Sequence, residues 1–190
     1  MKHALLLIVC LFAGVGVQAD DGSLMQRIME DYAFTQWGGT TRGNYARLVP
    51  KDWSLPELQL PTNALESIHV VTSKMGDRKR VFVAEGDRTI LRIDVEVCSD
   101  VEAAHRTIMD QFDNMTTTYR YPRLTNEIAD VLFFKDWGSR SFMTFARNNV
   151  YVSLRSNMAA CQITNVASQI DTSILYVSTN HASSSGHTLY

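Results

Sequence analysis

The stretch TILRIDVEV, residues 89–97, decides the fold that the sequence predicts. Its apolar side chains alternate with charged ones, a period of two that is typical of a β-strand with one buried face. The run is followed by SDVE, residues 99–102, which has the pattern of a capping box at the start of a helix. A strand that leads into a capped helix is therefore expected in the middle of the chain.

Similar elements are expected on both sides of this stretch. Strands are predicted at 67–73 and 80–84 before it, and at 128–134, 141–146 and 150–155 after it, with a hairpin turn at 147–149 where asparagines tolerate a left-handed backbone. Apolar residues at helical spacing predict an N-terminal helix at 22–36 and a last helix that carries Ile163, Val166, Ile170 and Ile174. The predicted class is α+β: one mostly antiparallel sheet of about six strands, formed by two βββα units after an N-terminal helix, with both long helices on one face.

A proline-containing connection at 44–65 separates the first helix from the first βββα unit. Within it, YARLVPKDW, residues 45–53, resembles the opening of PsbP-like domains, in which an aromatic–Pro–Trp strand enters the sheet. This resemblance implies a helix-flanked antiparallel sheet and assigns no role to any residue.

The first residues are typical of a secretory signal peptide. Lys2 precedes an apolar run at 4–17, and the run ends in Val17-Gln18-Ala19, which matches a small-x-small cleavage site. We therefore expect residues 1–19 to be a signal peptide, residues 20–177 to form one domain, and residues 178–190 to be a flexible tail. The mature chain is expected to be secreted or periplasmic, without a transmembrane segment.

The composition narrows the classes of function. A formal net charge of −2 argues against a nucleic-acid partner, which requires clustered cations. The common motifs of serine hydrolases, zinc proteases, dithiol enzymes and nucleotide-binding loops are absent from the sequence. His181 and His187 lack an evident third ligand, so neither a metal nor a cofactor is expected.

The cysteines support a disulfide, two free and buried thiols, or a catalytic thiol. Cys10 lies in the predicted signal peptide, which leaves Cys98 and Cys161 as a disulfide pair in an oxidising compartment. The last alternative is catalytic, because a thiol at a helix N-terminus ionises easily and His105 on the same helix would be its base.

Asp94 and Glu96 also support two interpretations. They share one face of their strand, where two carboxylates about 7 Å apart suit acid–base chemistry. The alternative is a solvated or salt-bridged face, with Arg92 beside them.

Tryptophans beside glycines are the candidate binding residues. Trp37 and Trp137 precede glycine-containing loops, and Arg42 and Arg140 lie close to them in sequence. Flat rings on such loops stack against ligands, and the arginines would hold an anion. Trp53 is expected to belong to the core.

These observations favour an exported, non-catalytic binding or accessory protein whose partner is a protein or a component of the cell envelope. The alternative is a small exported hydrolase or thiol enzyme that uses Asp94, Glu96, Cys98 or His105. A third possibility is an accessory subunit that docks on a larger complex through a flat sheet face.

Overall fold

The computed structural model describes residues 21–37, 45–60, 68–115, 121–124, 128–157 and 160–179. The predicted signal peptide, Arg42, and the histidines at 181 and 187 lie outside these ranges. The sheet is antiparallel in the order β1-β2-β3-β7-β6-β5-β4. Its strands are β1 (Ile68–Met75), β2 (Arg78–Glu85), β3 (Arg88–Val97), β4 (Arg123–Leu124), β5 (Val131–Asp136), β6 (Ser141–Arg147) and β7 (Val150–Ser156). The helices are α1 (Asp21–Asp31), η1 (a 3₁₀ turn at Phe34–Gln36), α2 (Val101–Asp113) and α3 (Ala160–Thr179). The predicted α+β class with a single antiparallel sheet is confirmed.

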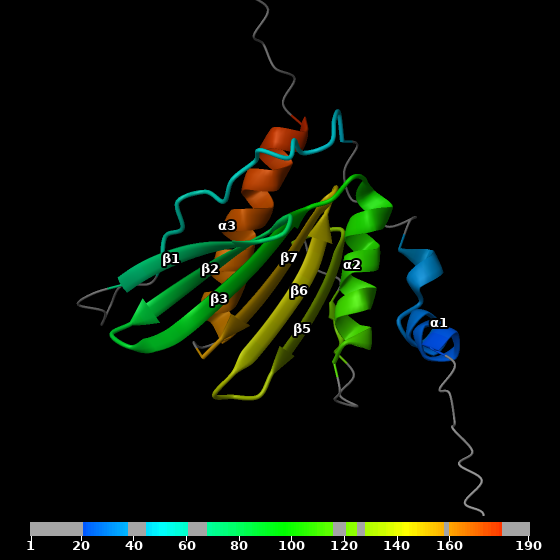
Figure 1. Ribbon diagram of the computed structural model, residues 1–190, viewed down its shortest axis with the longest axis horizontal. Coiled ribbons are helices and arrows are strands. Elements are labelled where there is room, and N and C mark those ends of the chain that lie inside the picture. The colour runs from blue at the N-terminus through cyan, green and yellow to red at the C-terminus, as the bar shows by residue number, and fades with distance from the viewer. Residues whose placement is uncertain are drawn as a thin grey trace, which may run out of the picture.

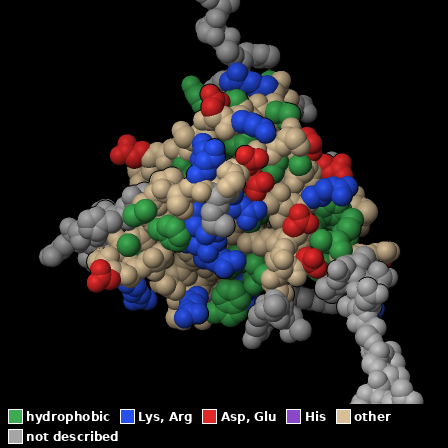
Figure 2. Space-filling model, in the orientation of Figure 1, with side chains coloured by type: hydrophobic (Ala, Val, Ile, Leu, Met, Phe, Trp, Pro, Cys, Tyr) green, Lys and Arg blue, Asp and Glu red, His purple; other side chains and the backbone are tan. Residues whose placement is uncertain are grey.

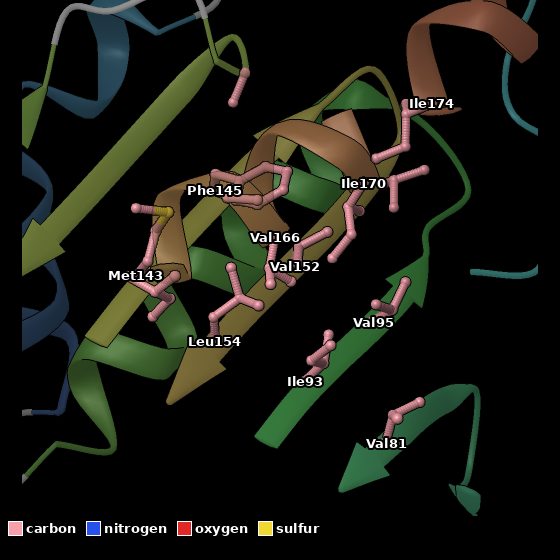
Figure 3. Close-up of a cluster of buried hydrophobic side chains, with 14 of the residues drawn as sticks. Val81, Ile93, Val95, Met143, Phe145, Val152, Leu154, Val166, Ile170 and Ile174 are labelled. Atoms are coloured by element: carbon pink, nitrogen blue, oxygen red, sulfur yellow. The ribbon is translucent and has the colours of Figure 1, made fainter. Parts of the chain in front are cut away.

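The two long helices cover opposite faces of the sheet, and the expectation that they share one face is wrong (Figure 1). Side chains of β7 alternate between the two layers: Val152 and Leu154 pack in the cluster that contains α3, whereas Tyr151 packs in the cluster that contains α2. Figure 3 shows the α3 cluster, in which residues of α3 meet the apolar side chains of β3, β6 and β7. The central strands are therefore buried on both faces.

The start of α2 follows the predicted pattern with a shift of one residue. Asp100 is the N-cap, and its side chain accepts a hydrogen bond from the Ala103 N–H at 2.8 Å. The segment at 45–53 contains no strand: it crosses the α3 side as irregular chain and buries Val49 and Trp53 in the core. Within the described residues, no helix is long and apolar enough to cross a membrane.

A buried polar cluster surrounds the β6–β7 turn. Arg147 is 2% exposed and bonds both carboxylate oxygens of Asp171 on α3, at 2.6 and 2.8 Å, and Asp130 at 3.2 Å. The Tyr45 hydroxyl donates to Asp130, and burial followed by this bond raises its pKa, which keeps the donor proton in place. One cation and two carboxylates thus join the sheet to α3 and to the connecting segment.

The same turn holds three backbone segments through its asparagines. Asn148 has a left-handed backbone (φ 52°), as predicted, and its side-chain amide donates to the Arg47 carbonyl and to Ser178 Oγ, both at 2.9 Å. The Asn149 amide donates to the carbonyls of Val49 and Cys98. Ser178 is fully buried in α3, so the predicted tail from residue 178 begins too early, and residues 180–190 lie outside the description.

The structure does not form the predicted Cys98–Cys161 disulfide, because Cys98 is a free thiol. Its backbone N–H bonds the Asn149 carbonyl, which places it beside the start of β7. Cys161 lies in the first turn of α3, which follows the other end of β7. The length of β7 is roughly 20 Å, whereas disulfide-linked Cα atoms lie within about 7 Å. The antiparallel pairing of β3 with β7 therefore separates the two cysteines.

Loss of the buried cation should strongly destabilise the fold. We expect Arg147→Met to lower the free energy of unfolding by about 3–5 kcal/mol, because two buried carboxylates lose their counter-ion. Urea unfolding followed by far-UV circular dichroism measures the change. Arg106→Met is the control, because the Arg106–Glu102 pair is exposed. Its free energy of unfolding should stay close to that of the wild-type protein. Equal stabilities for the two variants would contradict a structural role for the cluster.

Candidate functional site

Cys98 and His105 do not form the thiol–base pair that the catalytic alternative requires. The Cys98 sulfur lies 3.7 Å from Thr107 Oγ1, and burial raises the pKa of the thiol to about 11. His105 packs edge-on against Trp37 with ring centroids 5.7 Å apart, and burial lowers the pKa of its imidazole. Its Nε2 finds no hydrogen-bond partner among the described residues. Both groups are therefore neutral members of the α2 core near pH 7.

The carboxylates at 94 and 96 are engaged in cross-strand ion pairs. Asp94 is 3% exposed and accepts from Arg80 on β2 and from Arg92 Nε at 2.8 Å. Glu96 pairs with Arg78 at 2.8 Å. The register places each acid directly opposite an arginine of β2. This is the salt-bridged face that the sequence left as an alternative.

The three tryptophans have different environments. Trp37 is completely buried, and its indole N–H donates to the Tyr32 carbonyl at 2.9 Å, so the prediction that it binds ligand is wrong. The reason is its position after α1 and η1, which fold it into the aromatic core beside α2. Trp53 is buried, as expected. Trp137 is 43% exposed and is the candidate that stays available to a ligand.

Trp137 and Arg140 come together in the β5–β6 loop. The Trp137 N–H bonds the Arg140 carbonyl at 2.8 Å, and Gly138 takes a positive φ of 81° inside the turn, where a side chain would be strained. Asp136 caps the turn by accepting from the Gly138 N–H. Two of the four predicted binding residues thus share one rigid loop, while Arg42 lies outside the described residues.

This loop borders a hollow of about 580 Å³ on the α2 side of the sheet. We call it the arginine groove and define it by Arg92, Arg140, Arg155, Tyr121, Trp137 and Phe142. Trp137 lies edge-on to Tyr121, and the Arg155 guanidinium lies 5.8 Å above the Phe142 ring. A second hollow of about 400 Å³ shares Arg92 and Arg155 with the groove and also contains the carboxylates of Asp94, Glu96 and Asp110. The volume suits a small molecule or one side group of a larger partner.

The groove is positively charged although the chain is slightly acidic. Neither Arg140 nor Arg155 has an acidic partner among the described residues, and Arg92 shares Asp94 with Arg80. Lys and Arg side chains gather over the centre of this face, with a few Asp and Glu side chains among them (Figure 2). Arginines grouped in a concave surface concentrate positive potential there. In the described part of the chain, no group of three His, Cys, Asp or Glu residues suits a metal ion.

Sequence reasoning missed Arg155, Tyr121 and Phe142 as groove residues. Arg155 stands at a polar position of a predicted strand, which was a usable signal for a solvent-facing side chain. Arg155 lies beside Arg92 only because β3 pairs with β7, and these two strands are far apart in the sequence. Tyr121 reaches the groove from a short segment before β4, a strand that was not predicted.

The Cys98 thiol should be slow to react in the folded protein. Because its pKa is raised and alkylation requires the thiolate, iodoacetamide at pH 8 should label native Cys98 far more slowly than the same residue in urea, where the pKa returns to its ordinary value. Peptide mass spectrometry over a time course measures the two rates. Equal labelling rates in native and unfolded protein would restore the thiol-enzyme alternative.

Comparison with known proteins adds no relative: no family model, no curated protein and no solved structure matches the chain.

Proposed function

We propose that this is an exported, non-catalytic binding protein that holds its ligand in the arginine groove. The observation that carries the proposal is the meeting of a half-exposed tryptophan with three arginines in one hollow of about 580 Å³. Trp137 offers a flat apolar surface, and Arg140 and Arg155 offer guanidinium groups that have no acidic partner among the described residues. An aromatic ring and guanidinium groups that converge on one hollow are suited to hold a ligand with an anionic group.

The chemistry of the groove supports binding over catalysis. The described lining of the 580 Å³ hollow contains arginines, aromatic rings, hydroxyls and an amide, and the carboxylates of Asp94, Glu96 and Asp110 lie in the adjoining hollow. Asp94 and Glu96 are held in ion pairs, and Cys98 is buried in the α2 core. The four residues that the hydrolase and thiol-enzyme alternatives would use, Asp94, Glu96, Cys98 and His105, therefore form no catalytic pair among the described contacts.

Export is the second part of the proposal, and its support is the sequence of residues 1–19. The partner is then a component of the envelope or of the extracellular space, either a free molecule or a group displayed on a protein.

Loss of the exposed ring should weaken ligand binding. We expect Trp137→Ala to weaken ligand retention roughly threefold to tenfold, because one aromatic stacking contact contributes about that much to binding beyond the area that it buries. The measurement is native mass spectrometry of tagged protein purified gently from its own host, which compares the bound mass between variants.

Tyr176→Ala is the matched control, because Tyr176 is also an exposed aromatic residue (69%) but lies on α3, across the sheet. A mass retained by wild type and by this control, and reduced in Trp137→Ala, supports the groove. Equal retention in both variants counts against it.

Export predicts a shortened product. The intact mass of the protein from the native host should correspond to a chain that begins at Asp20, and Ala19→Asp should block the cleavage because the small residue is lost. A product that retains residues 1–19 would refute this part of the proposal and leave the groove untouched.

A further inference from the structure

Two arginines face each other across neighbouring strands in the floor of the groove. The register pairs Arg92 on β3 directly with Arg155 on β7. Side chains in directly opposite positions of an antiparallel pair have Cβ atoms about 4.5–5.5 Å apart, and like charges in such positions are destabilising. The sheet therefore carries a local repulsion at this point.

The neighbouring residues compensate only part of this charge. Asp94 bonds Arg92 and Arg80, so a single carboxylate serves two guanidinium groups. Arg155 is exposed and rests over Phe142, and no acidic group among the described residues contacts it. An added anion at this pair would bring the missing negative charge.

The remaining walls are flat and apolar. Phe142 follows Arg155 across the sheet on β6, and Trp137 and Tyr121 close the groove on the side of the β5–β6 loop. Arg140, on the same loop, adds a positive charge at the edge. A ligand that fits has a negative end for the arginine pair and a flat ring for the aromatic side.

We infer that the groove binds an anionic group carried on a flat apolar ring, such as an aromatic carboxylate or phosphate ester. The anion lies between Arg92 and Arg155, where charge-assisted hydrogen bonds form, and the ring lies against Trp137. This inference rests on the proposed function and specifies the ligand class of the same groove.

Isothermal titration calorimetry with five probes tests the class. The anionic ring compounds are phenyl phosphate and benzoate, the neutral one is benzyl alcohol, the cationic one is benzylamine, and inorganic phosphate supplies the anion without a ring. We expect an anionic ring compound to bind at least about tenfold more tightly than benzyl alcohol, since hydrogen bonds to charged groups are the strong ones. Phenyl phosphate and benzoate distinguish a phosphate site from a carboxylate site. Added salt should weaken binding of the anion.

Variants separate the two halves of the site. Arg155→Gln should weaken binding of the anionic probes about tenfold and leave benzyl alcohol unchanged, whereas Trp137→Ala should weaken every ring compound. Arg106→Gln is the control, because Arg106 is an exposed arginine on α2 that lines neither hollow, and it should bind like wild type.

Thermal unfolding provides a readout that a merely structural arginine would not produce. Without ligand, Arg155→Gln should unfold at the wild-type temperature or above it, because the repulsion with Arg92 is relieved. Addition of phenyl phosphate or benzoate should raise the unfolding temperature of the wild-type protein more than that of the variant. A loss of stability in the ligand-free variant would assign Arg155 a structural role and overturn the inference.

The possible outcomes distinguish the inference from the proposed function. Ring compounds that bind without preference for charge, and that depend on Trp137, would overturn the anion class while keeping the groove as a binding site. No binding by any of the five probes would overturn the ligand class, while the co-purified mass and its loss in Trp137→Ala still decide the proposed function.

Discussion

The buried charge of Arg147 is the constraint on which the rest of the structure depends. A guanidinium group that is removed from water must meet its full set of acceptors, and here these come from the start of β5 and from α3. The adjacent asparagines extend the same requirement to the connecting segment and to the end of β3. One hairpin turn thus fixes the positions of four chain segments that lie far apart in sequence. The α3 layer has little freedom to shift without exposing an unpaired charge, and the opposite face, which carries the arginine groove, is held on a rigid support.

All strands except β4 could be predicted from local patterns, most clearly from the alternation in β3, and the hairpin turn could be predicted because Asn148 tolerates a left-handed backbone. The placement of the helices was wrong for a physical reason. The charged side of β3 led to the expectation that only one face of the sheet is covered. In the structure, however, β6 is buried at every position, and β7 is buried at every position except Arg155. Strands that are buried on both faces require cover on both sides. The sequence carried this signal only in part, because β6 and β7 mix apolar residues with Ser, Thr and Arg.

The candidate site could be predicted only in part. Trp137 and Arg140 are neighbours in sequence, so a local argument about a glycine loop found them. Trp37 has a similar local pattern, yet a helix and a turn precede it and fold its ring inward. The arginine pair required the order of the strands, because Arg92 and Arg155 meet only when β3 lies beside β7. Long-range pairing is the information that periodicity and composition do not contain.

The layered arrangement has a consequence for the order in which the chain assembles. The apolar side of α2 packs on β6 and β7, which come later in the sequence, and β7 also joins the first hairpins to the second set of strands. During synthesis α2 is completed before the strands that shelter it exist, and no early segment possesses a finished core. Folding must wait for the C-terminal third of the chain, and contacts between such distant segments make the search slow. Neither layer of the core can therefore be complete until β7, the last strand, has been synthesised.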